Sequence, residues 1–128
     1  MGGNMLELIF GALIVYGLHL TLPSMMALLS GQVNFDFLAG PRDTAPDLSV
    51  AVQRAKRAAA NFSESLPIFL ALAILAIVMD KQAGEAAAIW LALRLVYTPV
   101  YIMGTPHLRT LVWIGSIICL IMMALALT

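Results

Sequence analysis

The stretch RAKRAAANFSESLPIF, from Arg54 to Phe69, decides how this chain folds. It places three cations, an asparagine and a glutamate at the start of a long apolar segment, in a chain that is 62% hydrophobic and only 11% charged. So little polar surface cannot coat a water-soluble globule, whereas a lipid bilayer needs no such coat. We therefore predict an integral membrane protein, in which the polar groups of this stretch need a specific explanation.

Four windows of the sequence supply the roughly 20 mostly apolar residues that a helix needs to cross a hydrocarbon core of about 30 Å. They cover residues 6–29, 49–79, 85–103 and 106–127. Backbone amides cannot stay unpaired in lipid, and the windows lack the alternation of an outer-membrane barrel strand, so each window is predicted to be a helix. The predicted fold class is all-α, a bundle of four membrane helices that forms a single domain over residues 1–128.

The connections between the windows predict how the helices are joined. Gly104, Thr105 and Pro106 supply a helix-ending glycine, a capping hydroxyl and a first-turn proline, which predicts a tight turn between the third and fourth helices. The first connection is much longer. Within it Thr44 and Asp47 have capping-box spacing, which predicts that the second helix begins near Ala45.

The distribution of cations predicts the orientation in the membrane. Five cations gather at the first and third connections, namely Arg42, Arg54, Lys56, Arg57 and Arg109. The second connection carries only Lys81, which acidic residues flank. By the positive-inside rule, the first and third connections face the cytoplasm and both termini face the opposite side.

Two of the predicted helices carry polar stripes that can face each other. At about 100° per residue, one arc of the second helix holds Arg54, Arg57, Asn61, Glu64 and Ser65. A similar arc of the third helix holds Trp90, Arg94, Tyr97, Thr98 and Tyr101. A charge near the bilayer centre costs about 2.5 to 3.5 kcal/mol, so these stripes should face protein or water. With Arg109 one turn into the fourth helix, they predict a polar cavity near the cytoplasmic side.

Such a cavity suits a small ligand that carries both carboxylates and an ammonium group. Guanidinium groups hold carboxylates in a bidentate fork, a glutamate holds an ammonium, and tyrosines add hydrogen bonds. The alternative interpretation is an interhelical network, in which Glu64 neutralises Arg57 or Arg94 so that the bundle can pack. A formal net charge of zero does not suggest a nucleic-acid partner, and two histidines with one cysteine do not favour a protein-bound metal.

The polar stretch resembles a family signature. Its residues fit the pattern R-A-x-x-N-x-x-E-x-x-P-x-F through Arg57, Ala58, Asn61, Glu64, Pro67 and Phe69. That pattern is typical of the MAPEG superfamily, the membrane-associated proteins in eicosanoid and glutathione metabolism, which includes microsomal glutathione transferases and leukotriene C4 synthase. Arg94, Tyr97, Tyr101 and Arg109 are similar to the family's pattern in its third and fourth helices, and the Gly40 to Asp43 loop resembles its bacterial branch.

The resemblance implies a homotrimer that binds glutathione as a co-substrate between subunits near the cytoplasmic side. By position, Arg57, Asn61 and Glu64 would hold the charged ends of glutathione, with Arg54, Arg94, Tyr97 and Tyr101 also at the pocket. Arg109 would stabilise the glutathione thiolate, and a lipophilic small molecule would reach it from the surrounding membrane lipids. Two departures from the pattern stand out: Ser65 occupies a position where leukotriene C4 synthase has a tyrosine, and the end of the first span carries no cation.

The sequence leaves three functions to weigh. The leading hypothesis is a glutathione-dependent transferase or peroxidase that acts on lipophilic electrophiles or hydroperoxides. The second is a non-catalytic membrane protein that binds a lipid headgroup or small anion in the same cavity. The third is a small multidrug transporter, which ranks last because Glu7 lies too close to the end of its span. His19, within the first span, is interpreted as a hydrogen-bonded packing residue rather than a proton carrier.

Overall fold

The computed structural model describes residues 2–42 and 47–128. Over these residues the chain forms five helices: α1 (Gly2–Leu29), α2 (Phe35–Ala39), α3 (Val50–Met79), α4 (Gly84–Met103) and α5 (Pro106–Ala126). The four long helices correspond to the four predicted spans, and each is long and apolar enough to cross a membrane. The predicted all-α class is therefore confirmed for the described residues, while the short helix α2 was not predicted.

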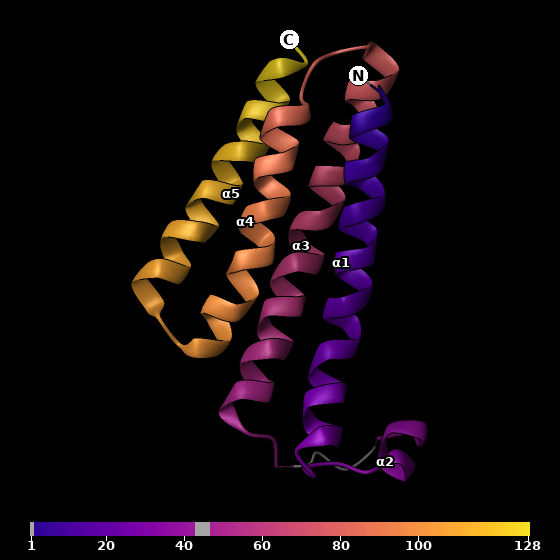
Figure 1. Ribbon diagram of the computed structural model, residues 1–128, viewed down its shortest axis with the longest axis vertical. Helices are drawn as coiled ribbons and strands as arrows, with labels where there is room; N and C mark the ends of the chain where they lie inside the picture. The colour runs from indigo at the N-terminus through magenta and orange to yellow at the C-terminus, as the bar shows by residue number, and fades with distance from the viewer. Residues whose placement is uncertain (1, 43–46) are drawn as a thin grey trace.

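The long helices run up and down, so the chain has two distinct ends (Figure 1). Both termini and the α3–α4 turn lie at one end, which we call the termini end. The first connection, α2 and the α4–α5 turn lie at the other, which we call the loop end. In Figure 1, α4 lies between α5 and α3, while α1 packs against α3 and α4. Both cation-rich connections therefore lie at the same end of the bundle.

Capping interactions explain where α3 begins and where α4 ends. Ser49 caps α3, since its hydroxyl accepts a hydrogen bond from the amide of Val52 at 3.3 Å. The predicted start near Ala45 is wrong: Thr44 and Ala45 lie outside the described residues, but Asp47 and Leu48, which follow them, are not helical. At the other boundary, Gly104 adopts the left-handed conformation that ends α4. The tight turn that was predicted before α5 is thus confirmed.

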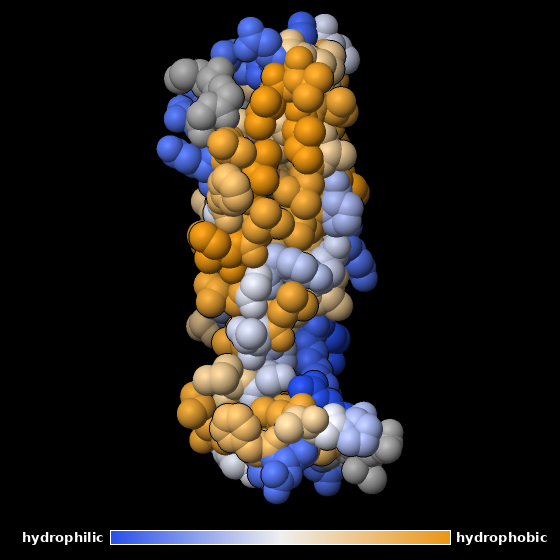
Figure 2. All heavy atoms as spheres, turned by 90° about the vertical axis from the view of Figure 1, so that its right-hand side faces the viewer, coloured by the Kyte–Doolittle hydropathy of each residue, from blue (hydrophilic) through white to orange (hydrophobic). Residues whose placement is uncertain are grey.

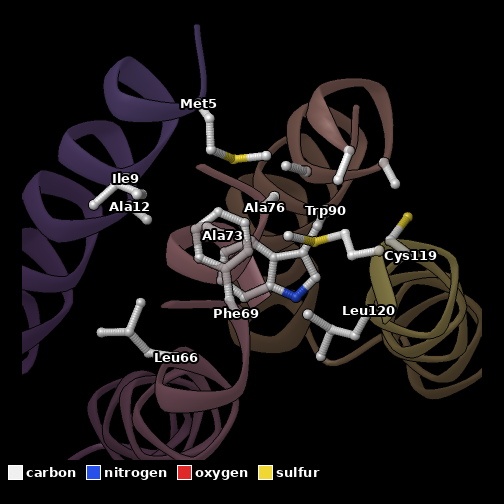
Figure 3. Close-up of a cluster of buried hydrophobic side chains, with 14 of the residues drawn as sticks. Met5, Ile9, Ala12, Leu66, Phe69, Ala73, Ala76, Trp90, Cys119 and Leu120 are labelled. Atoms are coloured by element: carbon white, nitrogen blue, oxygen red, sulfur yellow. The ribbon is translucent and has the colours of Figure 1, made fainter. Parts of the chain in front are cut away.

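The core is a stack of aromatic rings surrounded by small side chains. Phe69 of α3 and Trp90 of α4 stack with their ring centres 4.1 Å apart, and both are fully buried. Figure 3 shows these rings next to Ala73 and Ala76, with Met5 approaching from α1. Lipid tails are as apolar as the side chains, so close packing rather than the hydrophobic effect holds membrane helices together. The small residues let the helix backbones approach closely enough for that packing.

The outer surface of the bundle is apolar along most of its length. Large hydrophobic side chains on every long helix are exposed, among them Ile14, Val78, Leu111 and Leu125. Figure 2 shows one such face, which is hydrophobic over much of its height and turns hydrophilic where the molecule narrows towards the loop end. This distribution suits a surface in contact with lipid, with hydrophilic atoms gathered towards the two ends of the molecule.

Candidate functional site

Three elements bring their polar side chains together near the loop end, around the ring of Tyr101 on α4. Arg57 of α3 donates a hydrogen bond from Nε to the hydroxyl oxygen of Tyr101 at 3.1 Å. Arg109 of α5 places its guanidinium carbon 4.9 Å from the centre of the same ring. Tyr97 packs edge-on against Tyr101, with ring centres 5.6 Å apart. We call these four residues the arginine–tyrosine cluster.

The cluster leaves one proton of Tyr101 available for a ligand. A tyrosine hydroxyl can accept hydrogen bonds and also donate its single O–H. Because its oxygen accepts from Arg57, the O–H of Tyr101 points elsewhere. A ligand atom placed near Tyr101 and Arg109 would therefore meet one hydrogen-bond donor and one cation, which favours an anion over a neutral group.

A second contact lies deeper in the helix bundle, between α4 and α3. Arg94 donates from Nη2 to the side-chain oxygen of Asn61 at 2.7 Å. Its guanidinium carbon lies 4.4 Å from the ring centre of Tyr97 and 5.6 Å from that of Phe62, so two aromatic faces surround the charge. Only 1% of Arg94 is exposed, and its Nε and Nη1 have no hydrogen-bond partner in the described part of the chain.

The predicted site residues differ in how accessible they are. Arg57 and Glu64 are exposed on the side of the protomer, and the partly buried residues are Arg54, Asn61, Tyr101 and Arg109. Arg94 and Tyr97 are buried. The structure thus brings the two predicted stripes together, but it divides their members into an open group and a group inside the protomer. The role of each residue in binding remains a prediction.

Glu64 lies at a depth in the membrane where its charge should not face lipid. It is 15 residues before Met79, the last residue of α3, which corresponds to about 22 Å along the helix. If the hydrocarbon begins near Met79, its thickness of about 30 Å includes Glu64. Since a charge facing lipid at that depth is costly, the side of α3 that carries Glu64 must be covered by protein or by water.

Arg54 is held at the end of α4 rather than in the cluster. Its Nη1 donates to the carbonyl oxygen of Ile102 at 3.1 Å. The side chain passes Gly104, where an added Cβ would lie only 2.6 Å from Nη1 of Arg54. Gly104 also has a φ of +77°, a conformation that residues with a side chain rarely adopt. The left-handed conformation is therefore the main reason for a glycine here, since the flexible side chain of Arg54 can move away from an added Cβ.

We expect Gly104→Ala to destabilise the protein by about 1 to 2 kcal/mol, the cost of a left-handed conformation for a residue with a Cβ. The added methyl group would also displace Arg54 from Ile102. Unfolding in mixed micelles of increasing SDS content would measure the change. Gly17→Ala is the matched control, because Gly17 lies inside α1 with nothing within 4 Å of an added Cβ. An equal loss in both variants would contradict this explanation.

Phe62 is a contributor that the sequence did not assign to the site, and Thr98, which belongs to the predicted stripe of the third helix, has a partner in α1 that the sequence did not predict. Phe62 is fully buried and its ring stacks on His19 of α1, with centres 4.7 Å apart. His19 is hydrogen-bonded through Nδ1 to the carbonyl oxygen of Val15 at 2.8 Å and through Nε2 to Thr98 of α4. His19 is thus a hydrogen-bonded packing residue, as predicted. In the family signature Phe62 occupies a position that any residue can fill, so the signature did not mark it. No local sequence pattern indicates that His19 pairs with Thr98.

Other hollows of the molecule lie away from these residues. A groove of about 870 Å³ at the termini end runs between α1, the start of α4 and the end of α5, where Glu7 and Glu85 line it. It contains none of the predicted site residues. In the part of the chain that the structure describes, no three histidine, cysteine or acidic side chains gather to hold a metal ion.

Four helices that are long and apolar enough to cross a membrane, with the polar side chains of His19, Arg94 and Thr98 buried between them, define a multi-pass integral membrane protein. The family model of the MAPEG family matches residues 6–128, nearly the whole chain, so the protein belongs to that family. The MAPEG family includes glutathione transferases, glutathione peroxidases and related enzymes of eicosanoid metabolism, and it is associated with glutathione. A search of curated proteins found no match.

Proposed function

We propose that this protein is a membrane-bound, glutathione-dependent transferase or peroxidase that acts on lipophilic electrophiles or hydroperoxides. Among family members we place it with the bacterial type that resembles microsomal glutathione transferases. The observation that carries the proposal is the arginine–tyrosine cluster, in which Arg57 and Arg109 both contact Tyr101. An anionic sulfur at this point would meet a fixed cation and a hydroxyl donor.

Arg109 is the residue that we expect to stabilise the thiolate. A free thiol has a pKa of about 8.5, so little thiolate exists at neutral pH, and a nearby cation favours the charged form. Arg109 also lies in the first turn of α5, where the helix dipole adds a partial positive charge. Both effects would raise the fraction of glutathione that is ready to react.

The same thiolate supports two reactions. In conjugation, sulfur attacks an electrophilic carbon, and a leaving group such as chloride departs with the bonding electron pair. In peroxide reduction, sulfur attacks one oxygen of the hydroperoxide, the O–O bond breaks, and the alcohol leaves after taking up a proton. The resulting sulfenic acid then condenses with a second glutathione, which gives the disulfide and water. Neither reaction calls for a metal ion.

The remaining polar residues would hold the charged ends of glutathione. Arg57 is exposed and suits a carboxylate, while Glu64 is exposed and suits the ammonium group. Asn61 accepts from Arg94 through its side-chain oxygen, which leaves its amide N–H groups to donate to a ligand. Arg54 and the tyrosines would add contacts around these groups. Arg94 is buried, so we assign it to the support of Asn61 and Tyr97.

A homotrimer explains how the exposed charges are covered. Arg57 and Glu64 lie on the open side of α3, and a neighbouring subunit would cover that side and enclose the ligand. The loop end carries Arg42, Lys56 and Arg109, which supports a cytoplasmic loop end and non-cytoplasmic termini in a bacterial inner membrane. The trimeric state itself rests on the family resemblance.

The test is turnover by purified protein in lipid nanodiscs. We expect a thiol-dependent rate with a chromogenic chloronitrobenzene or a lipid hydroperoxide when glutathione is present, and native mass spectrometry should show trimers. The same protein without glutathione shows whether the rate depends on the thiol, and glutathione without protein gives the nonenzymatic rate. If neither substrate gives a rate above the protein-free reaction with glutathione, the proposed activity is wrong.

One observation favours a second function, a non-catalytic membrane protein that binds a lipid headgroup or small anion in the same place. The last turn of α1 carries no basic residue, although the family resemblance implies a cation there that grips glutathione. The cluster could then hold a phosphate group instead. Native mass spectrometry separates the two functions, since a retained phospholipid that glutathione does not displace would favour the second.

A further inference from the structure

A pocket of about 300 Å³ lies at the loop end, between the last turns of α1, helix α2 and the start of α3. Val52 and Lys56 are the α3 residues that line it. At about 100° per residue both side chains lie about 160° around α3 from Arg54, and neither Arg54 nor Arg57 lines the pocket. The pocket is therefore separate from the arginine–tyrosine cluster, and nothing in the proposed reaction uses it.

A pair of hydrogen bonds fixes the walls of this pocket relative to each other. The amide of Ser49, at the start of α3, donates to the side-chain oxygen of Gln32 at 2.6 Å. The side-chain nitrogen of Gln32 donates in return to the hydroxyl of Ser49 at 3.1 Å. Gln32 follows directly after α1, so this clamp joins the end of α1 to the start of α3. The pocket is thus a built feature of the fold.

The interior of the pocket is mostly apolar. Pro23 and Ala27 of α1 are buried beneath it, and Phe37 and Leu38 of α2 cover it. A water molecule occupies ~30 Å³ in the liquid, and a methylene group is of similar size, so the pocket holds about ten such groups. That is room for one medium-length hydrocarbon chain and too little for the two chains of a phospholipid.

Two cations line the same pocket, Lys56 from α3 and Arg42 from the first connection. No carboxylate is among the described residues that line it. An apolar interior next to two cations, with no carboxylate among the described lining residues, is complementary to an anionic amphiphile.

The backbone of Arg42 holds its side chain in this position. Arg42 has a φ of +59°, a left-handed conformation that is uncommon for any residue other than glycine. Its Nε and Nη2 donate to the carbonyl oxygen of Leu38 at 3.2 and 3.0 Å, which fixes the guanidinium at the end of α2. Strained backbone conformations of this kind gather at ligand-binding sites. The guanidinium keeps further N–H groups that can donate to an anion.

We propose that this pocket binds a single-chain fatty acid of about ten carbons, with its carboxylate between Arg42 and Lys56 and its chain against α1 and α2. The chain length follows from the volume of the pocket, and the carboxylate from its two cations. The loop end lies at the membrane surface, where the carboxylates of fatty acids reside, so the ligand reaches the pocket from the bilayer. This binding is independent of the proposed glutathione chemistry.

The test uses decanoate that carries a photoreactive diazirine at the end of its chain, with the protein in nanodiscs of neutral phosphatidylcholine. Peptide mass spectrometry should find the label on the last turns of α1 and on α2. Unlabelled decanoate should compete, whereas decanol, with the same chain and no charge, should compete at least about tenfold more weakly. Equal competition by decanol, or label spread over the lipid-facing surface, would overturn the proposal.

Two kinds of variant test the contribution of the two cations separately from that of the pocket volume. Lys56→Gln and Arg42→Gln should each weaken decanoate binding about fivefold, while Lys81→Gln, at the termini end, should leave it unchanged. Ala27→Phe keeps both cations but fills the pocket, so it should abolish specific labelling. Circular dichroism and the oligomeric state confirm that each variant is folded. Labelling that persists at wild-type level in folded Ala27→Phe places the ligand elsewhere and rules out this site.

Discussion

Replacing Arg109 with alanine is expected to lower kcat for glutathione conjugation by about 100-fold, the usual cost of removing one group that stabilises developing charge. In the structure the guanidinium of Arg109 lies over the ring of Tyr101, 4.9 Å from its centre, at the first turn of α5. On the proposed mechanism, the thiolate of glutathione loses the cation that stabilises it. Turnover of a chloronitrobenzene at saturating glutathione measures the effect.

The pH dependence of the rate gives a second readout for the same variant. A cation favours the thiolate, so the wild type should reach half of its maximal rate at a pH below about 8.5, the ordinary pKa of a thiol. In Arg109→Ala this midpoint should move upwards. Arg109→Lys keeps a charge and should recover part of the rate, and Lys81→Ala is the control for general loss of charge. A wild-type rate and midpoint in Arg109→Ala would exclude Arg109 from the chemistry.

The sequence predicted the four spans well because lipid imposes a simple rule on them. A helix that crosses the hydrocarbon must be apolar and about 20 residues long, so composition alone locates it. The second span was predicted at residues 49–79, and α3 covers Val50–Met79. Gly104 and Pro106 located the end of α4 and the start of α5. Helical periodicity also determines which residues share a face, and Arg57 and Asn61 of the α3 stripe do contact Tyr101 and Arg94 of the α4 stripe.

What the sequence could not provide is the depth of each side chain and its distant partners. Arg94 and Arg57 belong to facing stripes, yet one is 1% exposed and the other lies on the surface. That difference depends on how closely α3 and α4 approach, which small residues along both helices determine together. Helix α2 was missed because five residues are too few to show a period, although Asn34 caps it with a bond to the amide of Phe37 at 2.8 Å.

The second large effect concerns Arg94, for which we expect two substitutions to give different results. Arg94→Ala removes the hydrogen bond to Asn61 and leaves a cavity beside Tyr97 and Phe62, so it should destabilise the protein by about 3 kcal/mol. Arg94→Met fills most of that space with an uncharged side chain. Replacing a buried charge with an apolar group of similar volume is often neutral or stabilising, so Arg94→Met should change the free energy of unfolding by less than about 1 kcal/mol.

Activity then distinguishes a packing role from a positioning role. In Arg94→Met the side-chain oxygen of Asn61 loses its partner, so the amide can rotate and present the wrong atoms to glutathione. We expect the glutathione concentration at half-maximal rate to rise about tenfold, while kcat at saturation changes little because Arg109 is untouched. Arg94→Lys keeps the charge but lacks the planar fork, so it should resemble Arg94→Met in activity.

If Arg94→Met is as unstable as Arg94→Ala, the charge itself holds the bundle together. If Arg94→Met is stable and binds glutathione normally, Arg94 does not position Asn61. Its contacts with Tyr97 and Phe62 then serve packing alone.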